Sequence, residues 1–218
     1  MIFSGDQFNL ARLLSAAIVV LIAMAVHEYA HNYVADRMGD PTPRQMGRLT
    51  LNPFVHIDWF GYAMWVIVGF GALGYAIIRP ERMRNPRWGY LLAVAAGPFA
   101  NLLLAAFAAL LYRFNVWEYQ PIFGRRDIIP NFDQFMTVWF NLNMLLFLFN
   151  LIPLFPLDGW RVLLMLLPPK ESRQLQRYER ESYYVLIGLI LLSFIGLPIL
   201  GYAINPPFQF MARLLLGL

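Results

Sequence analysis

The stretch that decides the fold is Leu13–Ala35, LLSAAIVVLIAMAVHEYAHNYVA. Its first charged residue is Glu28, and Asp36 and Arg37 follow directly after its end. A helix that crosses a bilayer needs about 20 mostly apolar residues, so this stretch is long enough to span a membrane. Ionisable side chains inside a span are costly and are usually functional, so the acidic residue within this one calls for a chemical role.

Composition extends this interpretation to the whole chain. Of its 218 residues, 59% are hydrophobic and only 14% are charged, and the mean hydropathy is +0.53. Soluble domains average about 45–50% apolar and about 25% charged residues, so the composition argues against a soluble protein. Cysteine is absent, which excludes disulfide bonds and thiolate metal sites. The net charge of +4 lies in short segments between apolar runs. That distribution is typical of membrane topology, and no nucleic-acid partner is expected.

Four apolar runs predict transmembrane helices, at about 13–35, 90–112, 135–167 and 183–204. The third run is too long for one straight span, and Pro153, Pro156 and Gly159 predict a break within 150–159. We therefore expect an all-α polytopic membrane protein with about four transmembrane helices, forming a single membrane-embedded domain over residues 1–218.

Residues 59–78 are apolar enough to span, but their glycines weaken helix propensity. If this segment crosses the membrane, Lys and Arg divide seven against ten between the two sides; if it folds back, they divide twelve against five. The positive-inside rule favours the second arrangement. We expect a re-entrant segment with possible short β-strands, the N-terminus outside and residues 36–58 in the cytoplasm. Because non-helical backbone at membrane depth must be covered by protein or line a wet cavity, the segment is expected to line a cavity.

His27, Glu28 and His31 form an H-E-x-x-H motif at the end of the first run. The two histidines lie one helical turn apart on one face, so both imidazoles can reach a single ion. Glu28 lies beside them, placed to take a proton from water, while zinc acts as a Lewis acid. The alternative is two histidines hydrogen-bonded to other helices and a structural glutamate. The cost of ionisable groups inside a span favours the metal site.

A catalytic zinc site needs a third protein ligand and an open position for water, and Asp158 and His56 are the candidates. Asp158 lies at the predicted helix break in an apolar run, where an unpaired carboxylate would be expensive. It can also cap a short helix over 160–167, and the two roles are compatible. His56 lies in a turn-rich segment after the first helix. It is a candidate for a ligand, a proton donor or a substrate-positioning residue, and a surface histidine is the alternative.

Three asparagines, Asn141, Asn143 and Asn150, lie in the third apolar run. Asn150 is nearest the break, where an amide can hold a scissile carbonyl or stabilise its developing negative charge. The alternative is a structural asparagine that bridges helices, and for Asn141 and Asn143 this alternative is favoured.

Taken together, these motifs resemble those of the site-2 proteases, the intramembrane zinc metalloproteases of peptidase family M50. The resemblance covers most of the chain. The combination of H-E-x-x-H in the first span with an N-x-x-P-x-x-P-L-D-G break in a later one is highly specific. The matching segments are His27–His31, Gly47–Pro53 with His56–Asp58, Ala96–Asn101, and Phe149–Gly159.

The resemblance implies zinc held by His27, His31 and Asp158, with Glu28 as general base and Asn150 positioning the substrate. It implies hydrolysis of peptide bonds within or next to the transmembrane segments of other membrane proteins. The implied surroundings are the lipid bilayer of a prokaryotic cell membrane, with the active site toward the cytoplasm.

One segment departs from the family pattern. Members with this short architecture usually carry a Lys-Pro-Val-x-Val-like stretch after the re-entrant segment, and the corresponding residues here are Gly74–Pro80. The resemblance implies that this stretch pairs with an unwound substrate as an added strand. The functional alternative is a non-proteolytic membrane zinc protein, either a transporter or a metal-dependent adaptor. A haem protein is less compatible, because His27 and His31 share one helix face.

Overall fold

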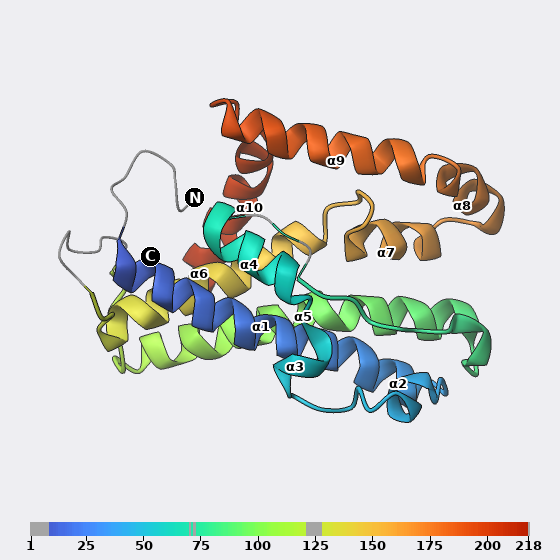
Figure 1. Cartoon of the computed structure of the whole chain (residues 1–218), viewed down its shortest axis with the longest axis horizontal. Helices are drawn as coiled ribbons and strands as arrows, with labels where there is room; N and C mark the ends of the chain where they lie inside the picture. The colour runs from blue at the N-terminus through green and yellow to red at the C-terminus, as the bar shows by residue number, and fades with distance from the viewer. Residues whose placement is uncertain (1–8, 70, 72, 121–127, 218) are drawn as a thin grey trace.

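The computed structural model describes residues 9–69, 71, 73–120 and 128–217, which form a bundle of helices (Figure 1). The elements are α1 (Leu10–Arg37), α2 (Thr42–Gln45), α3 (Pro53–His56), α4 (Trp59–Val68), the 3₁₀ turn η1 (Pro80–Arg82), α5 (Pro86–Arg113), α6 (Phe132–Asn150), α7 (Asp158–Leu166), α8 (Pro169–Gln176), α9 (Glu179–Phe194) and α10 (Ile199–Leu216).

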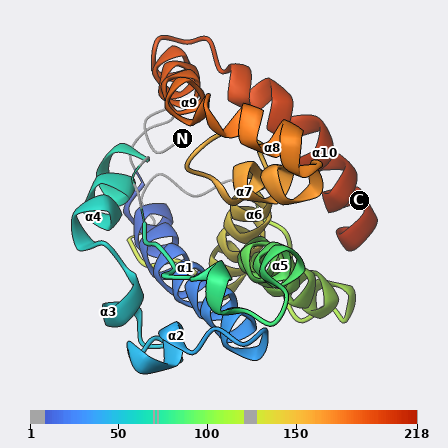
Figure 2. The ribbon, with the colours of Figure 1, turned by 90° about the vertical axis from the view of Figure 1, so that its right-hand side faces the viewer.

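Three long helices, α1, α5 and α6, form the centre of the bundle (Figure 2). Each begins after an asparagine, Asn9, Asn85 or Asn131, whose Oδ1 accepts a hydrogen bond from a backbone N–H of the first turn. All three helices are long and apolar enough to cross a bilayer. The predicted fourth span, 183–204, is divided between α9 and α10, which meet at 90° and make a fourth crossing if counted together. The protein is an all-α polytopic membrane protein, which confirms the predicted fold class.

The buried face of α5 consists largely of small residues. Ala105, Ala108 and Ala109 pack against Phe140 and Met144 of α6 in one buried cluster. Small side chains let helix backbones approach closely within a membrane, where packing takes the place of the hydrophobic effect. The helix axes are therefore close, and α5 comes within reach of the polar residues of α1.

The segment after α3 folds back on itself. α4 ends at Gly69, whose φ of 85° lies in the left-handed region that favours glycine. Gly71 then lies so close to the start of α4 that a β-carbon there would collide with the carbonyl oxygen of Gly61. An antiparallel bridge joins Ile57 to Gly74, so the chain leaves and returns at one level of the bundle. Within the described residues this bridge is the only β pairing, and it takes the place of the possible short strands.

The loop before α5 and the loop after α1 lie together at one end of the bundle. The backbone N–H of Arg79 donates to the buried carboxylate of Asp40 at 2.7 Å. The N–H of Arg84 donates to the carbonyl oxygen of Met38 at 3.0 Å. These bonds attach the chain before α5 to the end of α1, on the right in Figure 1. Phe70 and Ala72, which belong to the predicted re-entrant segment 59–78, lie outside the described residues. So do Arg125 and Arg126, two of the five Lys and Arg residues predicted on the non-cytoplasmic side.

The third apolar run holds two helices. α6 ends at Asn150, α7 begins at Asp158, and the residues between them form turns. At the far end of α7, the guanidinium group of Arg87 on α5 donates to the carbonyl oxygens of Met165 and Leu167 at 2.9 and 2.8 Å. These bonds occupy carbonyl groups at the end of α7 that the helix leaves without partners, and they hold α7 against α5.

Candidate active site

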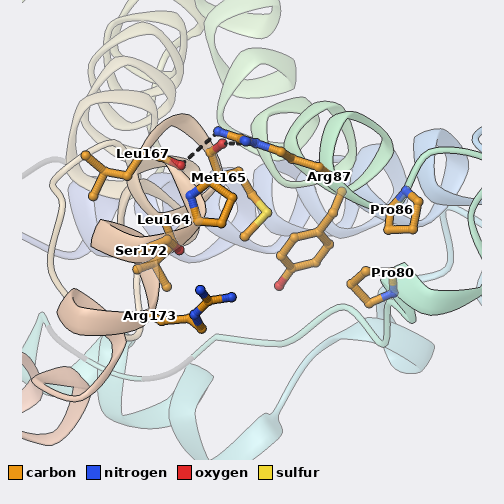
Figure 3. Close-up of a pocket in the computed structure, with 10 residues that line it drawn as sticks. Pro80, Pro86, Arg87, Leu164, Met165, Leu167, Ser172 and Arg173 are labelled. Atoms are coloured by element: carbon orange, nitrogen blue, oxygen red, sulfur yellow. Dashed lines mark hydrogen bonds between the residues drawn. The ribbon is translucent and has the colours of Figure 1, made fainter.

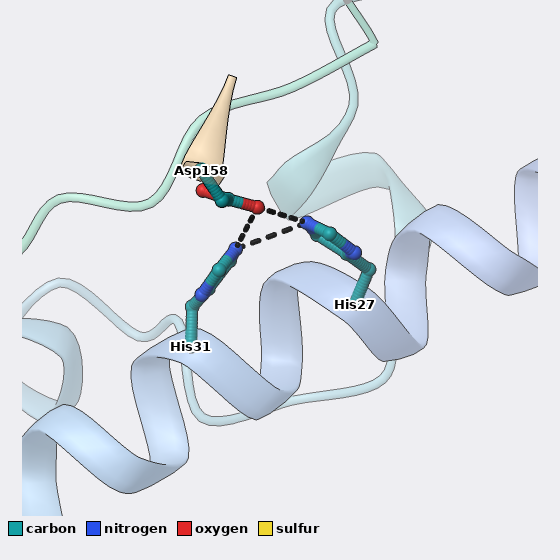
Figure 4. A group of neighbouring side chains, drawn as sticks. All are labelled: His27, His31 and Asp158. Carbon is teal, nitrogen blue, oxygen red and sulfur yellow. Dashed lines mark hydrogen bonds and ion pairs between the residues drawn. The ribbon is translucent and has the colours of Figure 1, made fainter. Parts of the chain in front are cut away.

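α1 presents His27 and His31 on its inner face, one helical turn apart (Figure 4). Both side chains are buried. Their Nε2 atoms lie 3.0 Å apart, and the two ring planes are inclined by 86°. Two imidazole nitrogens therefore converge on one point inside the bundle.

The third converging group comes from the start of α7. Asp158 is the first residue of that helix, and its Oδ2 lies 3.2 Å from Nε2 of His27 and 3.3 Å from Nε2 of His31. The positive end of the helix dipole stabilises a carboxylate at this position. Leu157 occupies the N-cap position, and none of the described side chains caps α7 by a hydrogen bond. The carboxylate of Asp158 thus reaches the histidines and does not cap its own helix.

One face of α5 lies against both histidine rings. Nδ1 of His31 donates to the carbonyl oxygen of Ala93 at 2.8 Å, and Nδ1 of His27 lies 2.6 Å from Oδ1 of Asn101. Gly97 lies midway between these two partners. A β-carbon there would collide with Nε2 of His31 and lie 2.7 Å from Nε2 of His27. A glycine is required at this position because the α5 backbone passes directly beside the Nε2 atoms of both histidines.

Asn101 is a site residue for which the sequence predicted no role. In the sequence it is only the last residue of Ala96–Asn101, one of the segments that resemble the family. The available signal was the one that singled out Glu28, a polar side chain inside an apolar run. The partner of such a residue lies on another helix, so the sequence signal marks the residue without saying what it contacts.

The three converging atoms form a suitable donor set for zinc. They are two imidazole nitrogens and one carboxylate oxygen, separated by 3.0, 3.2 and 3.3 Å. Zinc binds such ligands tetrahedrally at about 2.0–2.2 Å, which separates neighbouring ligand atoms by about 3.3–3.6 Å. Lone pairs that face one another at this distance repel unless a cation or a proton lies between them. Within the described residues this is the one group of its kind, and it leaves a fourth position open.

Glu28 lies next to this group on α1 and is only 3% exposed. Its Oε2 has no hydrogen-bond partner among the described residues. Burying an unpaired carboxylate oxygen costs free energy, so a hydrogen-bonding partner such as water or substrate is expected there. The segment after α4 covers this carboxylate, because a β-carbon on Gly74 would lie 3.4 Å from Oε1 of Glu28.

His56 is buried but lies outside the group formed by His27, His31 and Asp158. Its Nε2 lies 2.7 Å from the carbonyl oxygen of Thr50, and its Nδ1 has no partner among the described residues. His56 is therefore a buried residue bonded to the backbone of its own loop, which does not fit the alternative of a surface histidine.

The asparagines of α6 occupy different surroundings. Asn150 is the last residue of the helix, and its Nδ2 donates to the carbonyl oxygen of Leu146 at 3.0 Å. Asn143 is completely buried and accepts a hydrogen bond from Nδ2 of Asn101 at 3.1 Å. Asn143 thus bridges α5 and α6, in line with the structural alternative, and through Asn101 it is also connected to His27.

A separate cavity of about 380 Å³ lies between α5, α7 and α8 (Figure 3). Its lining includes Arg87, Tyr90, Leu164 and Arg173, and none of the three converging side chains. Figure 3 shows Arg87 turned toward the carbonyl groups at the end of α7. This cavity lies at the end of the bundle where Arg87 holds α7 against α5.

The chain is similar to proteins of a known peptidase family. The profile of Peptidase family M50 matches residues 15–125 and 125–195 of the chain. YwhC of Bacillus subtilis, named as a candidate zinc metalloprotease, is 37% identical over 177 residues, which cover 80% of this chain and 78% of YwhC. Rip2 of Mycolicibacterium smegmatis, with the same kind of name, is 26% identical over 176 residues, covering 78% of this chain and 64% of Rip2. No solved structure matches the chain.

Proposed function

This chain belongs to peptidase family M50, and we propose that it is an intramembrane zinc metalloendopeptidase. Its substrates are membrane proteins, cleaved within or next to their transmembrane segments. One observation carries the proposal. His27, His31 and Asp158 converge beside Glu28, whose Oε2 has no hydrogen-bond partner among the described residues, inside a bundle with three helices long enough to span a bilayer.

Nε2 of His27, Nε2 of His31 and Oδ2 of Asp158 would hold the zinc ion. When bound, zinc polarises the scissile carbonyl and lowers the pKa of the attacking water. The fold brings these three side chains together from α1 and α7, with α5 behind the histidine rings. Both histidines are held by their outer nitrogens, so the ligand atoms need little rearrangement to bind the ion.

Glu28 acts as the general base and then as the general acid. Its carboxylate takes a proton from the attacking water and later delivers a proton to the leaving amine. Burial keeps competing solvent away from this carboxylate, and the absence of a described donor on Oε2 leaves that atom available.

The substrate approaches along the segment that follows the α4 turn. Gly74 covers Glu28, and the residues after it have no regular secondary structure. We place an unwound substrate beside 76–79 as an added strand, because an extended peptide can form main-chain hydrogen bonds with an open backbone. The N–H of Arg79 is already bonded to Asp40, so the pairing uses the other main-chain groups of this stretch. Asn150 at the helix break and His56 beside the turn are the residues assigned to substrate positioning.

The active site faces the cytoplasm, and the whole chain forms a single membrane domain in which 59–78 is re-entrant. Two observations support this topology. The bridge between Ile57 and Gly74 closes the segment at one level. The loops before α5 and after α1 lie together at the end that carries most of the arginines.

The proposal is tested by replacing Glu28 with glutamine. Glu28→Gln should bind as much zinc as the wild type, because the three ligands are untouched. Cleavage of a reporter that contains a transmembrane segment should fall by at least about 100-fold, the lower range of general acid–base catalysis. Both quantities are measured on purified protein reconstituted in lipid.

Glu171→Gln, at an exposed position on α8, is the matched control and should cleave normally. Retained cleavage by Glu28→Gln would remove the general-base role. Wild-type protein that carries zinc across liposome membranes and cleaves no reporter would instead support the alternative of a zinc transporter.

A further inference from the structure

We propose that Asn101 is a positioning residue that fixes the tautomer of His27, so that its ring presents an unprotonated Nε2 to the metal. This inference rests on the zinc site of the proposed function. A neutral imidazole carries a single proton on one of its two nitrogens, and only the other nitrogen can bind a metal. The group that accepts a hydrogen bond from one nitrogen therefore determines whether the other is a ligand.

The side-chain amide of Asn101 has one possible orientation. Its Nδ2 donates to Oδ1 of Asn143 at 3.1 Å and to the carbonyl oxygen of Ala23 at 3.3 Å. Asn143 is oriented in turn, because its own Nδ2 donates to the carbonyl oxygen of Trp139 at 2.9 Å. Both asparagines are completely buried, so water does not compete for these bonds. Oδ1 of Asn101 therefore faces Nδ1 of His27 at 2.6 Å, and the histidine nitrogen must be the donor.

Without this acceptor, His27 has a competing arrangement. Its Nε2 lies 3.0 Å from Nε2 of His31 and 3.2 Å from Oδ2 of Asp158, and both of these atoms can accept a hydrogen bond. A His27 ring protonated at Nε2 would bond to one of them and close the metal position. The carbonyl group of Ala93 excludes the same outcome for His31, because a carbonyl oxygen can only accept. Oδ1 of Asn101 thus keeps the proton of His27 on Nδ1, as the carbonyl oxygen of Ala93 does for His31.

The first test measures zinc affinity by competition with a chelator, independently of proteolysis. Asn101→Leu should bind zinc about 10- to 100-fold more weakly than the wild type, the range found when an outer hydrogen-bond partner of a metal ligand is removed. Asn101→Asp keeps an acceptor oxygen for Nδ1 and should recover most of the affinity.

The matched control is Asn141→Leu. Asn141 also lies within a helix of the bundle, but its partner is the hydroxyl group of Tyr119, at 3.2 Å, and not a ligand. This variant should bind zinc as the wild type does. A loss of affinity in Asn141→Leu as large as that in Asn101→Leu would indicate a general packing effect and would overturn the inference.

The second test observes the tautomer itself. The chain has only three histidines, so ¹⁵N-histidine labelling gives a simple spectrum. In zinc-free protein, at a pH where the rings are neutral, His27 should carry its proton on Nδ1 in the wild type and on Nε2 in Asn101→Leu. A merely structural role for Asn101 would not move this proton.

Equal zinc affinity, or an unchanged His27 tautomer, in Asn101→Leu would overturn the inference. If that variant does not fold, Asn101→Ala removes the same acceptor without adding bulk and is judged by the same two measurements. Wild-type protein that binds no zinc would overturn the proposed function instead, so the two failures are distinguishable.

Discussion

Asp158 supplies the formal negative charge among the three atoms that converge in the bundle. Asp158→Asn would keep the shape of the side chain while removing that charge. Because loss of an outer partner of a ligand already weakens metal binding by about 10- to 100-fold, loss of the ligand charge should reduce zinc affinity by at least about 10-fold. Zinc content after dialysis against a chelator measures this effect.

The same substitution at Asp58, just before α4, is the matched control. Asp58 accepts a hydrogen bond from the N–H of Gly61 at 2.7 Å, and asparagine caps helices as well as aspartate does. Asp58→Asn should therefore leave zinc content unchanged. Undiminished zinc in Asp158→Asn would remove Asp158 from the ligand set and make His56 the next candidate to test.

At the scale of helices, the approach of α5 to α1 determines whether the metal position exists. Gly97→Ala would place a β-carbon against Nε2 of His31 and 2.7 Å from Nε2 of His27. We expect this variant to lose most of its zinc while α1, α5 and α6 still form, because alanine favours a helix over glycine by about 1 kcal/mol. Zinc content and helicity, measured together, check this prediction.

Gly188→Ala is the matched substitution in α9, where a β-carbon meets nothing within 4 Å. It should retain full zinc content. A Gly97→Ala variant that binds zinc as well as Gly188→Ala does would show that the two helices can separate without disturbing the histidines, contrary to the close approach seen in the structure.

For the whole molecule, the proposed topology places both ends of the re-entrant segment on the cytoplasmic side. The cysteine-free chain allows single cysteines to report their side of the membrane, at the exposed positions Gln45, Glu81 and Glu118. In intact cells a membrane-impermeant maleimide should label Glu118→Cys alone. Gln45→Cys and Glu81→Cys should react only after permeabilisation, because positively charged loops stay in the cytoplasm.

The positions before and after the α4 segment form the internal control of this experiment. Arg82 of η1 donates to the hydroxyl group of Thr42 on α2 at 3.3 Å, so these two loops belong to one end of the molecule. Opposite labelling of Gln45→Cys and Glu81→Cys would mean that residues 59–78 cross the bilayer, and the proposed topology would then be wrong.

The sequence by itself determined the features that depend only on residues close together in the chain, namely the apolar helices and the face that His27 and His31 share. The length of the apolar runs predicted the all-α membrane fold, since a bilayer sets how many residues a helix needs. The helical repeat placed His27 and His31 on one face before any packing was known. The bend between α9 and α10 was not predicted. Hydropathy along 183–204 shows how apolar the residues are, but it does not show whether the helix stays straight.

Only the tertiary structure decided which groups meet. Asp158 is 131 residues from His27 in the chain, and Asn101 is 74 residues from it. From the residues alone, Asp158 and His56 were both open as the third ligand, and Asn101 had no role. Helical periodicity tells which side chains share a face, but which faces come into contact depends on the packing of small residues between helices. That packing brought α5 and α7 to the two histidines of α1.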